Sequence, residues 1–187
     1  MNGGKVFAKS AAVIPFYARI FHAYPIIWRK RMETLDRYDR AILKTLQAKG
    51  RASNVELSEA ASLSPPQCYR RVRRLESEGI IRGYMAQVDP AAIGLGVVAF
   101  VSINIHREQF KHVRALEKAI RQFPEILECY TISGDFDYLL KVAATDLKAL
   151  SSFLTDRLMQ VPGVSGVRSM VCLEEIKPAS ALPIEVR

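Results

Sequence analysis

The chain is most tightly constrained by residues 64–76, where a helix-forming pattern carries four arginines within five positions, 70–74. Ser64 suits the N-cap of a helix, because its hydroxyl can accept a hydrogen bond from a free backbone N–H of the first turn. Pro65 suits the first helical position, where its missing N–H removes no hydrogen bond. Gly79 can adopt the left-handed conformation that ends a helix. The pattern therefore predicts a helix that begins after Ser64 and ends just before Gly79.

The predicted helix has one apolar face and one cationic face. Cys68, Val72 and Leu75 are spaced i, i+4 and i+7, so they form a stripe that suits packing against a core. At 3.6 residues per turn most polar residues fall away from that stripe, with Arg71 at its edge. The residues that point away are Gln67, Arg70, Arg73 and Arg74. Such a helix attaches to a core on one side and presents positive charge on the other.

Two further helices are predicted within residues 34–61, ahead of the arginine-rich helix. Asp36 can cap the first, and Ser53 or Asn54 can cap the second. A tight turn at residues 62–64 then leads into the arginine-rich helix. This succession is the plan of a helix-turn-helix, whose last helix enters the major groove of DNA.

Residues 34–84 are therefore predicted to form a winged helix-turn-helix DNA-binding domain, in which residues 80–84 form a short strand or wing. The net charge of +8 is unevenly distributed. Residues 1–32 carry six basic side chains and no acidic one, residues 34–85 have a net charge of +4, and residues 86–187 have a net charge of −1. The prediction of DNA binding thus depends on where the four arginines lie, and less on overall basicity.

Residues 1–33 form a basic leader rich in aromatic side chains, in which Pro15 and Pro25 interrupt any long helix. We expect this leader to be disordered or to lie upstream of a true start at Met32, because chain termini commonly lack order. Its composition leaves membrane-surface contact and targeting as alternatives. No apolar run reaches the ~20 residues that a membrane span needs, so we expect no membrane partner.

The sequence pattern changes after a connector, residues 85–96, that contains turn-forming Asp89-Pro90. Residues 97–176 alternate β-rich runs with helical spacing. The predicted strands are 97–105, 126–133, 138–144 and 164–173, and the predicted helices are 108–122 and one beginning after Asp146. The order β-α-β-β-α-β is the ferredoxin-like pattern, which makes the chain an α+β protein. Residues 177–187 are predicted to form a tail.

The two helices of the ferredoxin-like domain would cover only one face of its sheet. The other face would be exposed, so we expect it to pair with a second subunit or domain. Two subunits would be joined through this domain and the connector strand.

The arginine-rich helix has the chemistry of DNA recognition, although a run of charge is more often a solvated helix face. An arginine can donate two hydrogen bonds to guanine O6 and N7, and Gln67 could read adenine. Ser64 and Tyr69 could bind phosphate oxygens, aided by the partial positive charge of the helix N-terminus. No acidic residue interrupts residues 64–75. The candidate DNA-binding residues are Ser64, Pro66, Gln67, Tyr69, Arg70, Arg71, Arg73 and Arg74.

Catalysis is not supported by the sequence. Asp135 and Asp137 could be a carboxylate pair, but no histidine, further acidic cluster or nucleophile–base pair accompanies them. The three cysteines are odd in number and lack metal-ligand spacing, so we expect them to be small buried side chains in a reducing compartment. They are Cys68, Cys129 and Cys172. We expect no catalytic residue, metal or cofactor.

These features together resemble the Lrp/AsnC family of prokaryotic transcription regulators, over about residues 35–183. The motifs that carry the resemblance are Leu35-Asp36 with Asp39 and Ile42-Leu43; Gly50-Arg51 with Leu57; Leu63-Ser64-Pro65 with Arg70-Arg71-Val72 and Arg74-Leu75-Glu76; Gly79-Ile80-Ile81 with Tyr84; Gly134-Asp135-Phe136-Asp137-Tyr138-Leu139-Leu140; Pro162-Gly163-Val164; and Leu173-Glu174 with Lys177. Each motif alone is weak evidence for the family, but their occurrence together in this order is specific to it. The leader is the departure, because the family pattern does not require it.

The resemblance implies a winged helix-turn-helix followed by a βαββαβ domain that binds effectors and oligomerises. Members form dimers that associate further, often to octamers, and many respond to amino acids. The effector pocket would lie by the 134–137 loop, at an interface between dimers. Backbone N–H groups there could hold a carboxylate, and an aspartate could hold an α-amino group, whereas spacing alone favours a simple hairpin turn. The implied effector-binding residues are Gly134, Asp135, Asp137, Tyr138, Ser133 and Thr131.

We therefore expect a sequence-specific transcription regulator in the cytoplasm, associated with the nucleoid. Its expected partners are double-stranded DNA, an amino acid or related metabolite that modulates oligomerisation, and further copies of the same chain. Two alternatives stay open. One is an architectural, nucleoid-type DNA-binding protein without ligand control, and the other is a metabolite-binding module whose DNA binding has lapsed.

Overall fold

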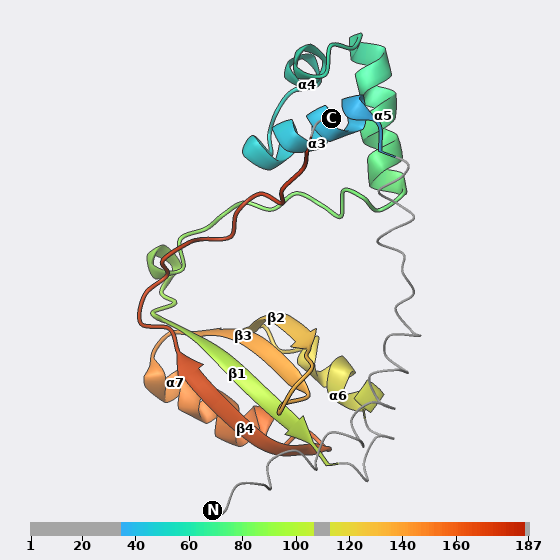
Figure 1. The fold of residues 1–187 in the computed structure, drawn as a ribbon. Coiled ribbons are helices and arrows are strands. Elements are labelled where there is room, and N and C mark those ends of the chain that lie inside the picture. The colour runs from blue at the N-terminus through green and yellow to red at the C-terminus, as the bar shows by residue number, and fades with distance from the viewer. Residues whose placement is uncertain (1–34, 107–112, 186–187) are drawn as a thin grey trace, which may run out of the picture. The chain divides into compact units, whose positions relative to one another are not determined.

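The structure, a computed structural model, describes residues 35–106 and 113–185 (Figure 1). The predicted leader, residues 1–33, lies outside the described residues. So do residues 107–112, which include the start of the predicted helix 108–122.

The chain forms two compact units. Among the described residues, the first, here the helical unit, contains residues 35–86 together with residues 177–185. The second, here the sheet unit, runs from Gln87 to Ile176. The predicted tail therefore clusters with the helical unit, and most of the predicted connector clusters with the sheet unit.

The helical unit contains three helices, α3 (Arg37–Ala48), α4 (Asn54–Ala60) and α5 (Pro65–Ser77). The cap predicted for α3 is confirmed: the Asp36 carboxylate accepts hydrogen bonds from the N–H groups of Tyr38 and Asp39, both at 2.9 Å. The Asp39 carboxylate accepts in return from the Asp36 N–H, at 3.3 Å. This reciprocal capping box satisfies N–H groups that the helix itself cannot pair.

Helix α4 begins with a second capping box. Ser53 is the N-cap, and its hydroxyl and N–H pair with the N–H and carboxylate of Glu56. The Lys49 ammonium, followed by these Ser53 groups, lowers the pKa of Glu56 to about 2. This capping box determines the first residue of α4, and therefore the position of the turn that leads into α5.

One face of each helix forms the core of the helical unit. The buried residues of this core are Ile42, Leu43, Leu57, Ala61, Cys68 and Leu75. The stripe predicted for α5 is present, with Cys68 and Leu75 fully buried and Val72 packed at the margin. Fully burying a leucine side chain stabilises a fold by about 1.5–3 kcal/mol. The apolar side of α5 therefore fixes which of its polar residues can face outward.

Residues 80–84 were predicted to form a short strand or wing, and the described chain forms no strand there, so the strand alternative was wrong. Gly79 ends α5 with φ 67°, and the N–H groups of Ile80 and Ile81 then both bond to the Leu75 carbonyl. These bonds fold the chain back onto the end of α5. The side chains of Ile80 and Ile81 pack against the helical core, which the alternating pattern of a strand would not allow for both.

The sheet unit is a four-stranded antiparallel sheet of β1 (Val97–Ile105), β2 (Ile126–Thr131), β3 (Tyr138–Ala144) and β4 (Val164–Val171). The strand order is β2-β3-β1-β4. Helix α6 (Val113–Ile120) joins β1 to β2. Helix α7 (Leu147–Ser152) continues into the wider turn η3 (Phe153–Leu158) before β4. The predicted βαββαβ order and ferredoxin-like fold are confirmed.

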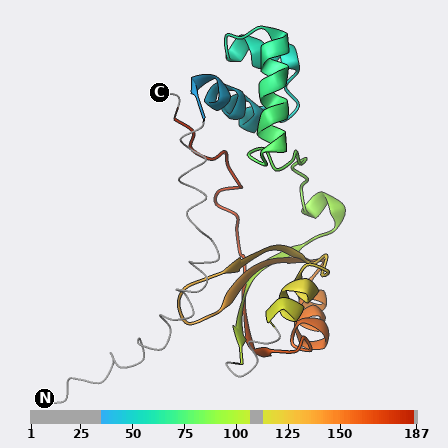
Figure 2. The same ribbon diagram turned by 90° about the vertical axis from the view of Figure 1, so that its right-hand side faces the viewer.

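Both helices of the sheet unit cover the same face of the sheet, as Figure 2 shows. Alternate residues of the central strands are buried beneath them. On β1 and β3 these are Ala99, Val101, Ile103, Ile105, Tyr138, Leu140, Val142 and Ala144. The alternate side chains of the strands and the helically spaced apolar side chains of α6 and α7 therefore pack into one core.

The opposite face of the sheet carries no helix among the described residues, and we call it the open face. Strand register places Phe100, Leu139, Tyr130 and Met170 on it. Phe100, Tyr130 and Met170 are exposed. The predicted uncovered face is therefore present, and it exposes apolar side chains.

Within one chain the connector, residues 85–96, forms no strand, and its pairing between two subunits stays a prediction. Its ordered element is instead the single turn η1 (Ala91–Ile93), which Pro90 begins and Gly94 ends with φ 81°. The Leu95 N–H folds back to the Pro90 carbonyl at 2.9 Å.

Candidate DNA-binding helix and effector loop

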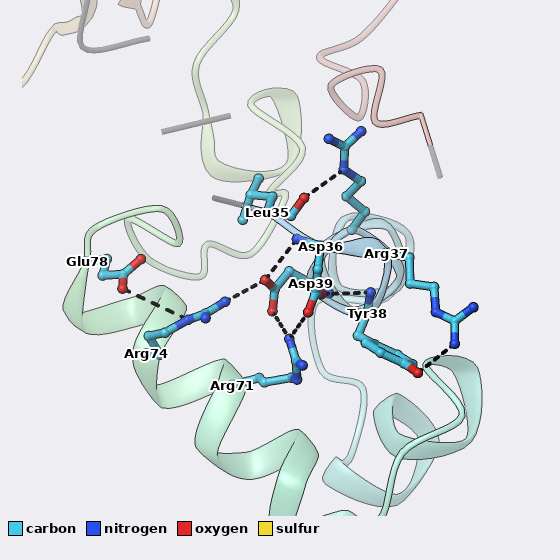
Figure 3. A network of polar contacts seen from close by, with 9 residues as sticks. Leu35, Asp36, Arg37, Tyr38, Asp39, Arg71, Arg74 and Glu78 are labelled. Atoms are coloured by element: carbon cyan, nitrogen blue, oxygen red, sulfur yellow. Dashed lines mark hydrogen bonds and ion pairs between the residues drawn. The ribbon is translucent and has the colours of Figure 1, made fainter. Parts of the chain in front are cut away.

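The four arginines of α5 fall into two pairs with different surroundings. Arg71 Nη1 lies 2.7 Å from Asp36 Oδ2 and 2.9 Å from Asp39 Oδ1. Arg74 Nη2 binds the other oxygen of Asp39, and Arg74 also approaches Glu78. Figure 3 shows the Asp39 carboxylate between the two guanidinium groups. This pair of arginines ties α5 to the beginning of α3.

Asp39 has no exposed surface, whereas the side chains of Arg71 and Arg74 are 26% and 43% exposed. A buried carboxylate is costly unless it is paired and hydrogen-bonded, and here both oxygens are paired. Burial pushes the pKa of Asp36 upward, but the N–H groups of Asp39 and Tyr38 and the Arg71 guanidinium outweigh it and hold that pKa below its usual value. Asp36 is therefore suited to stay charged beside Arg71.

The stretch 64–75 gives no indication of this network, because the acidic partners lie outside it. The partners lie on α3, more than thirty positions away. The sequence does contain one indication of this network. Asp39 lies three residues before Ile42, on the apolar side of its helix. A carboxylate in such a stripe indicates a buried partner.

Arg70 and Arg73 point away from α3. Both are exposed, and Arg73 makes only a surface contact with Glu76, at 3.1 Å. Within the described chain Arg70 has no ion pair or hydrogen bond through its side chain. Surface pairs such as Arg73–Glu76 contribute little to stability, so both guanidinium groups are available to a ligand.

The other candidate DNA-binding residues of α5 are exposed as well. They are Ser64, Pro66, Gln67 and Tyr69. The Gln67 side chain also accepts a hydrogen bond from the Ser64 N–H, at 3.3 Å, which closes the first turn. The structure therefore brings six of the eight predicted residues to the outward surface of α5. It places Arg71 and Arg74 against α3.

In the loop between β2 and β3, Asp137 has a structural role. Asp137 Oδ2 accepts a hydrogen bond from the Ile105 N–H at 2.8 Å, where the β1–β4 register shifts. The Asp137 N–H donates to the Ile103 carbonyl at 3.0 Å. Asp137 thus fastens the loop to the end of β1, which leaves Asp135 as the exposed carboxylate of the loop.

The remaining predicted effector residues divide between the loop and the core. Thr131, Ser133 and Gly134 are exposed beside Asp135, and Gly134 has φ 135°, a conformation that favours glycine. Tyr138 points the other way, into the core under α6, with its hydroxyl 3.3 Å from Glu117 Oε1. Burial, together with Glu117, raises the pKa of Tyr138. The structure does not bring the Tyr138 side chain to the loop surface.

The prediction for the cysteines holds in part. Cys68 is buried, but Cys129 is exposed and Cys172 is only partly covered. Cys129 lies on β2, an edge strand that pairs only with β3, which explains its exposure. The described residues hold no cluster of potential metal ligands. No helix among them is long and apolar enough to cross a bilayer.

Comparison with known proteins identifies both units. Residues 35–82 match a family model for winged helix-turn-helix DNA-binding domains, and residues 98–182 match the model for the Lrp/AsnC ligand binding domain. The leucine-responsive regulatory protein of Escherichia coli K12 is 43% identical over 153 residues, which cover 82% of this chain and 93% of that protein. The same protein of Klebsiella pneumoniae matches to the same extent.

Solved structures agree with this. A transcriptional regulator of Neisseria meningitidis, in complex with L-Met, is 41% identical with a TM-score of 0.75 and covers 80% of this chain and 97% of that one. An AsnC family regulator of Agrobacterium tumefaciens is 34% identical with a TM-score of 0.73, at 80% and 97% coverage. Identity of this extent across both units shows that the chain belongs to the Lrp/AsnC family of transcriptional regulators.

Proposed function

We propose that this regulator reads DNA through the outward surface of α5, with Arg70 and Arg73 as its principal contacts. The observation that carries the proposal is the division of the arginines. Asp36 and Asp39 hold Arg71 and Arg74, while Arg70 and Arg73 are exposed. A fixed helix with two accessible guanidinium groups suits the major groove, where arginine pairs with guanine.

The other exposed residues of α5 fit supporting roles. Gln67 suits an adenine edge, and Ser64 and Tyr69 suit phosphate oxygens near the helix N-terminus. Arg74 remains 43% exposed, so its unused N–H donors can also reach a phosphate. Arg71 is assigned to positioning, because its guanidinium bridges two aspartates.

We infer that the effector is an α-amino acid or a similar small metabolite. The Neisseria relative binds L-Met, and residues 98–182 match a ligand-binding domain. In the loop after β2, Asp135 suits an α-ammonium group, and Ser133, Thr131 and the Gly134 backbone suit a carboxylate. Asp137 would act indirectly, by holding the loop to β1.

The open face supports self-association. It exposes apolar side chains at Phe100 and Met170, and exposed apolar patches commonly mark interfaces. Charged residues lie on the same face: Lys141 of β3 is opposite Phe100 and pairs with Glu128 of β2, and Arg168 lies on β4. A second copy stacked here would give a dimer that presents two α5 helices.

Ligand-dependent association of dimers would then change which DNA sites are bridged. We infer that the protein acts in the cytoplasm, associated with the nucleoid.

Calorimetric titration of the full chain with each common amino acid tests the effector assignment. We expect at least one to bind and to change the affinity for DNA. Asp135→Ala should weaken that binding about tenfold or more, because it removes a charged hydrogen-bond partner. Glu174→Ala removes an exposed carboxylate elsewhere in the chain and should leave binding unchanged. Absence of binding by every amino acid would contradict the assignment and favour the architectural alternative.

A further inference from the structure

After β4 the chain returns to the helical unit and lies along α3 (Figure 1). The Leu182 N–H donates to Gln47 Oε1 at 2.6 Å, and Gln47 Nε2 donates back to the Leu182 carbonyl at 3.1 Å. Arg40 Nη1 donates to the Glu185 carbonyl at 3.0 Å. All three hydrogen bonds use the backbone of the tail, so α3 holds the tail as an extended peptide.

The distance between the two contact residues on α3 matches the distance between their partners in the tail. Arg40 and Gln47 are seven residues apart on α3, which puts them on one face about 10.5 Å apart along the axis. Leu182 and Glu185 are three residues apart, which spans about 10 Å in an extended chain. The pairing of Gln47 with Leu182 and of Arg40 with Glu185 makes the tail antiparallel to α3. Pro183 restricts Leu182 before it to the extended region that this match requires.

Ile184 supplies an apolar anchor between these polar contacts. Its side chain packs against the core cluster of the helical unit, whereas Leu182 is 69% exposed. The tail is thus held by one partly buried side chain and by backbone hydrogen bonds. On another side of the same helix, Asp39 holds Arg71 and Arg74 of α5.

We propose that Arg40, Gln47 and the core around Ile184 form a docking site for residues 182–185 of the same chain, so that the tail is a structural part of the DNA-binding unit. The chain then connects the two units twice, through the connector and through the tail. If the proposed function holds, the second connection is a route by which the ligand-binding unit acts on α3. The docking itself stands without that function.

Hydrogen exchange of the full chain, followed by mass spectrometry, tests the docking without DNA or effector. We expect Ile184→Asp, and a chain ending at Ala181, to raise exchange in α3 by about tenfold while β1 and β3 stay protected. Leu182→Ala is the matched control. The Leu182 side chain is exposed and only its backbone bonds to Gln47, so exchange should match the parent chain. Parent-like exchange in Ile184→Asp and the truncated chain would overturn the proposal.

A cross-link distinguishes the tail of the same chain from that of a second copy. The paired substitutions Gln47→Cys and Leu182→Cys place two thiols where the hydrogen bonds were. We expect oxidation of this full-length variant to join the two positions within one chain. A disulfide found only between chains would overturn the intrachain docking.

Discussion

Replacing Asp39 with alanine should lower the free energy of unfolding of the helical unit by about 2–4 kcal/mol. Breaking a buried ion pair commonly costs about 3–5 kcal/mol, and the lower value follows because Arg71 and Arg74 keep some contact with water. Asp39→Ala also removes the acceptor that pairs with the Asp36 N–H. Thermal and urea unfolding, followed by circular dichroism, measure the change. Small domains have only about 5–15 kcal/mol of stability, so the effect should be large.

A double-mutant cycle identifies the cause of that loss. If Asp39 acts through the arginines, then Asp39→Ala should cost at least 1 kcal/mol less in an Arg71→Ala/Arg74→Ala background, in line with the couplings of about 0.5–3 kcal/mol seen for contacting residues. Glu59→Ala, which removes an exposed carboxylate on α4, is the control and should change stability by less than about 0.5 kcal/mol. Strictly additive effects of Asp39 and the arginines would contradict the network as the source of stability.

The double variant Arg70→Ala/Arg73→Ala should retain the stability of the parent and lose most of its DNA affinity. Each guanidinium that reads a base or neutralises a phosphate contributes about tenfold or more, so a loss of about a hundredfold is expected. The slope of log K against log salt should fall by about one for each phosphate contact removed. Fluorescence anisotropy of labelled DNA, repeated from low to high salt, gives both quantities.

Lys148→Ala is the charge-matched control for each single substitution, Arg70→Ala and Arg73→Ala. Lys148 is exposed on α7 in the sheet unit, so its loss removes one positive charge away from α5. It should change DNA affinity only slightly. A larger effect from Lys148→Ala than from either arginine substitution would show that general charge, rather than the surface of α5, governs binding.

Local signals in the sequence predicted the helices and strands well, because they depend on neighbouring residues. Asp36 and Ser53 cap their helices as expected, and Gly79 ends α5 in the left-handed conformation. The alternation of β1 and the helical spacing of α6 and α7 gave the correct βαββαβ order. Each of these features is determined within a few residues of the chain.

The contacts that divide the arginines of α5 could not be predicted in the same way. Whether Arg71 faces DNA or Asp39 depends on how α3 crosses α5, which is a matter of tertiary packing. The same holds for Asp137, which binds the Ile105 N–H across 32 positions, and for Gln47, which binds Leu182 across 135. Hydrogen bonds from a side chain to a distant backbone group leave no pattern in the sequence around either partner.

The absence of a strand at residues 80–84 has a physical cause as well. A strand requires a partner that supplies hydrogen bonds, and an apolar run indicates only that side chains are buried. Ile80 and Ile81 are covered by the helical core without any strand partner.

Selection of genomic DNA fragments by the full-length protein, with and without the amino acid that titration identifies, tests the central claim most directly. The selected fragments should share a palindromic sequence whose half-sites lie about one helical turn, or a multiple, apart, because a symmetric dimer presents two α5 helices. Added effector should change which fragments are retained. Fragments with no shared sequence, retained equally with and without effector, would contradict sequence-specific and ligand-responsive regulation by this chain.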